Sequence, residues 1–365
     1  MTLAAAVAPV VPTSQSPRLR VLDLLRFCAA LGVLMFHYVE TRAWGTPHAF
    51  PALSTVSAFG LYGVRLFFMI SGFVILMTVW DSSPAEFAAS RIARLYPAYW
   101  ASVLILGALS LVGLTTDHRP GLGEFLVNFT MFQHGLRVRD LEIVYWTLWM
   151  ELVFYVLVGV LAAVGVTYRN CLVFLGAWTF LLLLAERSGS HLLKIVFMPV
   201  AAPYFIAGVA FYLIRRFGPS LFPWLFVAVG WIIAVSHELK EQSIMTRFGV
   251  ALGSGAVVGL VSLMFAVMAL VALGKLDGLD RWRWMTWLGA LTYPLYLFHH
   301  HVGFLVIQWL HPVLDNRLTL MVAIAVALLV AYAVHRLVER PLGPRLRAAL
   351  RRSLSTAPRD RAAPV

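Results

Sequence analysis

Charged side chains are scarce in this chain. Asp, Glu, Lys and Arg make up only 13% of its 365 residues, against about 25% in typical soluble domains. Cysteine is nearly absent too, and neither Cys28 nor Cys171 has a partner at the spacing of a zinc site or of a disulfide framework. These shortages exclude an ordinary soluble domain and support neither a zinc motif nor a disulfide-held scaffold.

Apolar residues dominate instead, at 61% of the chain, and the mean hydropathy is +0.82. A helix needs about 20 apolar residues to cross a bilayer, whereas a closed barrel shows alternating segments of about ten residues, a pattern missing here. We therefore predict an all-α polytopic membrane protein with about ten transmembrane helices. The predicted spans are 21–40, 57–80, 97–115, 143–166, 171–186, 195–214, 221–236, 248–273, 288–309 and 318–338.

Basic residues lie mainly at the ends of these spans. Placing the amino terminus in the cytoplasm puts the excess of Lys and Arg on cytoplasmic segments, so the positive-inside rule predicts that both termini are cytoplasmic. The net charge of +12 then reports topology and gives no indication of a nucleic-acid partner. The chain divides into a cytoplasmic segment 1–20, a membrane-embedded domain 21–340 and a basic tail 341–365. We expect the tail to be disordered and attracted to anionic lipid.

The first span carries two ionisable side chains, Arg26 and His37. Eleven residues turn a helix by about three full turns, so both project from one stripe, about 16 Å apart. Because lipid penalises a central Arg by roughly 2.5–3.5 kcal/mol, this stripe should face protein or a wet cavity. A snorkelling Arg26 paired with Asp23, and a hydrogen-bonded packing role for His37, are the alternatives. As a chemical group, His37 is a natural proton acceptor for a hydroxyl.

Two further charges, Arg65 and Glu151, lie at similar depth in the second and fourth spans. An isolated buried charge is costly, so we expect these two to pair with each other or with His37. A purely structural ion pair is the alternative.

The loop after the second span contains a capping box, Ser83 and Glu86, with Pro84 at the first helical position. We predict a short cytoplasmic helix from this point, with Pro97 starting the next span. Arg91 and Arg94 lie three residues apart on one face of that helix, a spacing that suits phosphate oxygens. Positive-inside anchoring is the alternative reading of these two arginines.

The ninth span carries Tyr293, Tyr296 and three consecutive histidines, His299 to His301. Neighbouring residues diverge by about 100° around a helix, so the three imidazoles cannot share one face, which disfavours a compact metal site. The external loop 116–143 is rich in polar and aromatic groups and is either an acceptor-binding lid or a solvated connector. Its polar residues include Asp117, His118, Asn128, His134 and Asp140.

Several segments, taken in order, resemble signatures of the acyltransferase 3 family, whose members are multi-span enzymes that O-acylate carbohydrates and some other acceptors. The segments are LDLLRFCAALGVLMFHY, GVRLFFMISGFVI, SRIARLYPAYW, WTLWMELVFY, TYPLYLFHHHV and LVERPL, covering about residues 19 to 341. The resemblance implies that His37 is the essential catalytic residue, matched with Arg26, and that Arg91 and Arg94 handle acyl-CoA. The remaining matches are Phe67, Phe68, Ser71 and Gly72 in one segment, Trp146 and Glu151 in another, and His299 in a third. Two more histidines follow His299, where other members often have an aromatic residue and a proline.

These observations combine into one functional hypothesis. Cytoplasmic acyl-CoA, with acetyl as the default acyl group, docks near Arg91 and Arg94 and reaches toward His37 along the cavity lined by Arg26. His37 then acts as general base toward an acceptor hydroxyl, or carries the acyl group itself. Glu151 or Arg65 would orient its imidazole or stabilise developing charge, and Glu151 is predicted to be catalytic together with His37. Ser71, Trp146, Tyr296 and His299 are further residues predicted to orient substrate or charge. No metal or tightly bound cofactor is predicted.

The acceptor is predicted to be a cell-surface polysaccharide or its lipid-linked precursor, and the location to be the bacterial cytoplasmic membrane. A secondary metabolite such as a macrolide would require the same hydroxyl chemistry. Two other readings stay open at this point. One is a transporter, in which intramembrane charges are equally normal, and the other is an inactive acyl-CoA or glycan-lipid binding protein. The oligomeric state is left open.

Overall fold

The computed structural model describes residues 19–45, 49–114, 119–245 and 252–355, and these residues form helices and no strand. The helices are α1 Arg20–Val39, η1 Arg42–Trp44, α2 Pro51–Ala58, η2 Phe59–Tyr62, α3 Gly63–Val79, α4 Pro84–Leu111, α5 Leu122–Asn128, α6 Tyr145–Val164, α7 Tyr168–Arg187, α8 His191–Phe197, α9 Ala202–Phe217, α10 Leu221–Met245, α11 Ser254–Ala272, η4 Asp277–Arg281, α12 Trp284–Leu310, α13 Asn316–Val334, η5 His335–Glu339 and α14 Arg340–Ser355.

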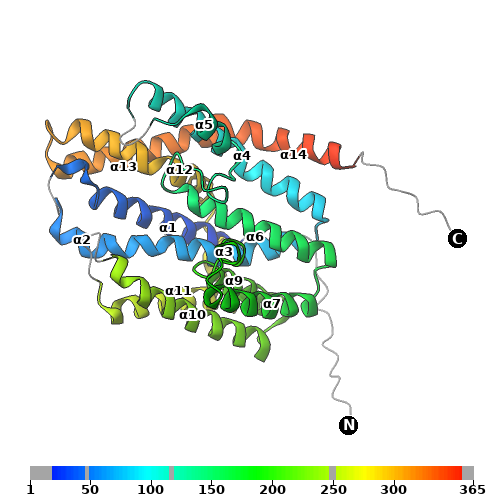
Figure 1. The fold of residues 1–365 in the computed structure, drawn as a ribbon. Coiled ribbons are helices and arrows are strands. Elements are labelled where there is room, and N and C mark those ends of the chain that lie inside the picture. The colour runs from blue at the N-terminus through cyan, green and yellow to red at the C-terminus, as the bar shows by residue number, and fades with distance from the viewer. Residues whose placement is uncertain (1–18, 46–48, 115–118, 246–251, 356–365) are drawn as a thin grey trace, which may run out of the picture.

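The long helices lie side by side with their axes roughly parallel (Figure 1). Within the described part of the chain, nine helical segments are long and apolar enough to cross a membrane. The predicted all-α polytopic architecture is thereby confirmed. α12 is not one of the nine, although its 27 residues cover the predicted ninth span, because its tyrosines and three histidines make it more polar than its neighbours.

α12 is held by close contact with α1 and α13. Gly303 permits the approach to α1, because a Cβ at this position would lie 2.0 Å from the ring of Tyr38. α3 and α9 are in similarly close contact, and a Cβ on Gly208 would lie 2.1 Å from the carbonyl oxygen of Met69. Such close backbone approach at small residues is a usual means of packing helices in a membrane.

The predicted break before Pro97 is wrong. The capping box forms as expected: Ser83 accepts from the backbone of Glu86, whose side chain accepts from the backbone of Ser83. The helix that begins there continues through Pro97 to Leu111 as α4. Pro97 lies more than three turns from the helix start and is thus an interior proline. Membrane helices accommodate such prolines more readily than soluble ones.

The predicted disorder of the tail 341–365 is also wrong for its first part. Residues 340–355 form α14, which packs beside α4, and Arg351 contacts the carboxylate of Glu86. Residues 356–365 lie outside the described part of the chain, as does most of the segment 1–20. The basic residues of α14 therefore face protein as well as any lipid surface.

Candidate functional site

His37 lies near the end of α1 against α12. Its Nδ1 is 3.0 Å from Nε2 of His299, and its ring centroid lies 5.0 Å from that of His300, edge-on. Tyr38 fixes the same part of α12 by donating a 2.8 Å hydrogen bond to the backbone carbonyl of His299. Two of the three consecutive histidines thus face the histidine of the first helix.

The hydrogen bonds of His299 determine which nitrogen of His37 carries a proton. Nδ1 of His299 lies 2.9 Å and 3.1 Å from the backbone oxygens of Tyr296 and Leu295, and because carbonyl oxygens only accept, this nitrogen is the donor. Nε2 of a neutral His299 must then accept, so Nδ1 of His37 donates to it. Nε2 of His37 therefore has the lone pair, which makes it the atom available as base or nucleophile.

Arg65 does not pair with Glu151 or His37, and the prediction that it does is wrong. Its Nε donates at 2.7 Å to Glu238 of α10, which also accepts from Tyr204, and the Arg65 and Glu238 side chains are buried. The predicted seventh span ended at residue 236, whereas α10 continues to Met245 and brings Glu238 into the bundle. Arg65 is thus part of a buried structural ion pair.

Glu151 does not orient His37 either. Its Oε1 accepts from the hydroxyls of Ser71 and Tyr155. Ser71 comes from α3, while Glu151 and Tyr155 come from α6 and lie one helical turn apart. The residues that contact the His37 ring from α12 are instead His299 and His300.

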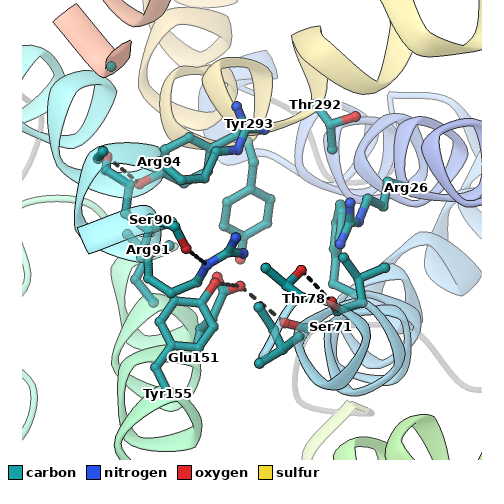
Figure 2. A pocket seen from close by; sticks show the side chains of 18 of the residues that line it. Arg26, Ser71, Thr78, Ser90, Arg91, Arg94, Glu151, Tyr155, Thr292 and Tyr293 are labelled. Atoms are coloured by element: carbon teal, nitrogen blue, oxygen red, sulfur yellow. Dashed lines mark hydrogen bonds between the residues drawn. The ribbon is translucent and has the colours of Figure 1, made fainter. Parts of the chain in front are cut away.

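A cavity of about 780 Å³ is lined by Arg26 and by residues of α3, α4, α6, α12 and α14. We call it the Arg26 cavity. Arg91 and Arg94 reach into it from α4, on the side opposite Arg26, and Tyr155 lies next to Arg91 (Figure 2). The basic residues of its lining are Arg26, Arg91, Arg94, Arg347 and Arg351. Glu151 is the one carboxylate among the described lining residues, so the cavity suits an anionic ligand.

Aromatic side chains hold the two arginines of α4. Arg91 donates to Ser90 and its guanidinium lies 6.0 Å from the ring centroid of Tyr155. The guanidinium of Arg94 lies 5.8 Å from the ring centroid of Tyr293 and 3.5 Å from Glu339. Because guanidinium groups stack on aromatic faces, these contacts keep two cations in place while leaving donors for a ligand.

One wall of the Arg26 cavity adjoins His299. Tyr296 lines the cavity there, and its hydroxyl is 2.8 Å from that of Thr147 on α6. Its ring packs edge-on against Phe67 and lies 5.8 Å from the ring of His299. His37 itself does not line the cavity, contrary to the expected direct path, because Tyr296 and His299 lie between them.

A second pocket of about 760 Å³ adjoins His300 and His301. It is lined by Glu142, Trp146, His300 and His301, together with residues of the predicted external loop, and we call it the Glu142 pocket. It shares no lining residue with the Arg26 cavity. Trp146 lines this pocket and not the Arg26 cavity, although its ring lies edge-on to Phe68 of that cavity.

The described part of the predicted external loop, residues 119–143, is structured. Asn128 is buried and bonds through its side chain to the backbone of Glu124, Arg139 and Leu141. His134 lies 3.0 Å from Asp140, and both line the Glu142 pocket. The described part of this loop therefore forms a wall of the Glu142 pocket, and its role as an acceptor-binding lid stays a prediction. Asp117 and His118 lie outside the described residues.

Sequence reasoning missed three kinds of site residue. Arg347 and Arg351 were taken for lipid-facing tail, although their spacing of four residues predicts a common face on a helix. Thr147 and Tyr155 gave no signal among the many apolar and aromatic residues of α6. Glu142 stands at the edge of a predicted span, where a carboxylate is ordinarily solvated, and only the fold reveals its burial.

Comparison with known proteins identifies relatives along most of the chain. The profile of the acyltransferase 3 family, described as "Acyltransferase domain", matches residues 19–336. The exopolysaccharide production protein ExoZ of Rhizobium meliloti (strain 1021) is 26% identical over 335 residues, which cover 86% of this chain and 96% of ExoZ.

Two shorter matches cover less than a third of each protein. Nodulation protein 10 of Rhizobium leguminosarum bv. viciae is 32% identical over 117 residues, or 30% of this chain and 30% of that protein. The acyltransferase MdmB of Streptomyces mycarofaciens is 31% identical over 105 residues, or 28% of this chain and 27% of MdmB. No solved structure gives a significant match.

Proposed function

Since the chain belongs to the acyltransferase 3 family and is therefore an O-acyltransferase of the membrane, we propose that its donor is acyl-CoA and that the Arg26 cavity opens to the cytoplasm to receive it. Acetyl is the proposed acyl group. The proposed acceptor is a hydroxyl of a glycan or glycan-like molecule, either a surface polysaccharide or its lipid-linked precursor, and the proposed location is the bacterial cytoplasmic membrane.

The composition of the Arg26 cavity is the observation that carries this proposal. Coenzyme A combines phosphate groups with a long pantetheine arm, and the lining of the cavity combines five arginines with apolar and aromatic side chains. Arg91, Arg94 and Arg347 would bind the phosphates, since guanidinium groups match phosphate oxygens in bidentate geometry. The thioester would then approach the packed rings of Phe67 and Tyr296, next to His299.

His37 is the proposed catalytic residue, and its Nε2 is the proposed reacting atom. By the direct route this nitrogen takes the proton from the acceptor hydroxyl as the hydroxyl oxygen attacks the thioester. By the covalent route it attacks the thioester itself and carries the acyl group to the acceptor. In both routes His299 is a positioning residue that holds the proton on Nδ1 of His37.

The likeness to ExoZ, which is named for exopolysaccharide production and matches over 96% of its length, makes a polysaccharide the first choice of acceptor. MdmB matches over a short stretch, so a secondary metabolite is the second choice. A transporter would move its substrate without cleaving the thioester. Release of free thiol from acetyl-CoA that depends on His37 separates the proposed enzyme from that alternative.

The donor site predicts ligand-dependent stability. In detergent-purified protein, acetyl-CoA should raise the temperature of unfolding, because a ligand that binds only the folded state adds about 2.7 kcal/mol at 100 times its Kd. The double variant Arg91→Ala, Arg94→Ala and the single variant Arg347→Ala should lose most of this shift. The measurement is the unfolding midpoint by intrinsic fluorescence with acetyl-CoA, longer acyl-CoAs and free CoA.

Arg345→Ala is the matched control, because Arg345 is exposed on the same helix and does not line the cavity. It should retain the wild-type shift. An equal loss of the shift in Arg345→Ala and Arg347→Ala would point to unspecific attraction of anions by α14. Absence of any shift in folded wild-type protein would contradict the donor site.

The positioning role of His299 predicts different results for two substitutions. Glutamine places a carbonyl oxygen near the position of Nε2 and can accept from His37, whereas leucine cannot. We expect His299→Leu to lower kcat about 10- to 100-fold, the range found when the hydrogen-bond partner of a metal-binding imidazole is removed, and His299→Gln to lose much less. The KM for acyl-CoA should stay unchanged in both. Equal kcat values for the two variants would contradict the tautomer assignment.

A further inference from the structure

The Glu142 pocket holds a carboxylate in an unusual position. Glu142 is 3% exposed, and its Oε1 accepts from the backbone of Ile143 at 2.8 Å and from Nδ1 of His300 at 2.7 Å. Its Oε2 is buried and has no hydrogen-bond partner among the described residues, with Nδ1 of His301 3.9 Å away. A buried carboxylate oxygen normally has a partner, so this atom points to a donor supplied by a ligand of the pocket.

The surroundings of Glu142 also favour its ionised form. Burial acts to raise the pKa of this carboxyl, but the adjacent His300 and His301 rings act in the opposite direction, and the pKa of Glu142 is held below its ordinary value. Its backbone carbonyl accepts from Tyr145, the first residue of α6, so the carboxylate lies at a helix start, where a negative charge is favoured.

The bond to Glu142 fixes the tautomer of His300. A carboxylate only accepts, so the proton of a neutral His300 is on Nδ1 and the lone pair is on Nε2. This is the carboxylate–imidazole arrangement that orients a general base in hydrolases and transferases. The His300 side chain is 32% exposed and lines the Glu142 pocket, while its ring lies 5.0 Å from that of His37. A base therefore stands at the boundary between this pocket and the catalytic histidine.

We infer that the Glu142 pocket binds the hydroxyl-bearing acceptor and that His300, held by Glu142, is the general base that activates the acceptor hydroxyl, while His37 carries the acyl group between the two cavities. The inference rests on the proposed function. It follows from the place of His37, which lines neither the Arg26 cavity nor the Glu142 pocket and lies between them.

The two steps balance as follows. Nε2 of His37 bonds to the acyl carbon of the thioester, the carbon–sulfur bond breaks, and CoA leaves as the thiolate. In the second step the acceptor oxygen bonds to the acyl carbon and its proton passes to Nε2 of His300. The bond from carbon to His37 breaks, and the electron pair returns to Nε2 of His37. His300 then releases its proton to water in the Glu142 pocket. A second hydroxyl of a sugar can donate to the open Oε2 of Glu142, which favours a polyhydroxylated acceptor.

The test measures the two steps separately in full-length protein in detergent. The probes are acetyl-CoA as donor, with a panel of methyl glycosides and water as acceptors, and the readouts are acyl-protein by intact-protein mass spectrometry and transfer to glycoside or water. In His300→Gln we expect transfer to fall at least about a hundredfold while acyl-protein at His37 accumulates. Glu142→Gln should show the same pattern with a smaller fall, because Glu142 acts through His300.

His311→Gln is the control, since His311 lies just after α12 against Trp44 and outside both cavities, and it should behave as wild type. Transfer by folded His300→Gln at close to the wild-type rate would overturn the inference, as would loss of acyl-protein together with transfer. If His300→Gln fails to fold, Glu142→Gln decides by the same readouts. Wild-type protein that forms neither acyl-protein nor product would contradict the proposed function itself, a result distinct from failure of the His300 step.

Discussion

His37→Ala is expected to lower the rate of acyl transfer about 10²- to 10⁴-fold, because that is the usual contribution of a positioned base and loss of a covalent carrier costs at least as much. Nε2 of this residue is the atom left with the lone pair once Nδ1 donates to His299. No other described side chain combines the contact to His299 and His300 with a place between the two cavities. The measurement is acetyl-CoA-dependent transfer, together with release of free thiol, in detergent-purified protein.

His37→Ala must also be shown to fold and to bind the donor. His37 is partly buried, so we expect a modest change in the unfolding temperature and an unchanged stabilisation by acetyl-CoA. His311→Ala serves as the matched substitution of a histidine beside an aromatic ring and should keep wild-type activity. A folded His37→Ala protein that transfers acyl groups at the wild-type rate would remove His37 from the mechanism under either route.

Arg65→Met is expected to destabilise the protein by about 3–5 kcal/mol, because it leaves the Glu238 carboxylate buried without its cationic partner. The two groups are 2.7 Å apart, and the Arg65 and Glu238 side chains are 8% and 3% exposed. The double variant Arg65→Met, Glu238→Gln removes both charges and keeps an acceptor for Tyr204, so it should recover most of the loss. Unfolding temperatures of the three proteins measure the effect.

The exposed pair Arg215 and Asp277 provides the control for this prediction. Its atoms are 2.8 Å apart, but the side chains are 24% and 47% exposed, and exposed ion pairs contribute about 0–1 kcal/mol. Arg215→Met should therefore change the unfolding temperature only slightly. If the double variant Arg65→Met, Glu238→Gln is stable yet inactive, Arg65 or Glu238 takes part in function and the purely structural reading of the pair is wrong.

Part of the lining of the Arg26 cavity was predictable from the sequence. The spacing of Arg26 and His37 predicted one functional stripe on the first span, and Arg91 and Arg94 were expected to lie together near the start of α4. The structure confirms that Arg26, Arg91 and Arg94 line one cavity. Arg91 and Arg94 are close in the chain, where helical geometry alone fixes which side chains share a face, whereas their meeting with Arg26 was expected only from the family resemblance.

Partnerships between helices were not predictable in the same way. Glu238 became the partner of Arg65 because α10 is longer than its apolar run and packs on α9, which in turn contacts α3. Glu151 was predicted to be the partner of Arg65 because the two residues lie at a similar depth in the membrane. Depth alone does not determine which helices are neighbours in the bundle. From a single sequence one can predict that a buried charge has a partner, but not which residue that partner is.

The histidines of α12 illustrate the same division. Sequence established that three consecutive imidazoles diverge around a helix, and hence that at most two of them serve one site. Tertiary packing decided which: α1 meets α12 so that His37 contacts His299 and His300, and Glu142 reaches His300 from the loop before α6.

The sequence by itself determined that this protein is a bundle of membrane helices with an ionisable stripe on its first helix, because hydrophobicity and helical periodicity are local properties of the chain. Only the tertiary structure decided that the stripe ends between two cavities, that His299 sets the tautomer of His37, and that α14 adds arginines to the Arg26 cavity. These features depend on which helices become neighbours, and the packing of small residues and buried polar pairs across the whole bundle settles that choice.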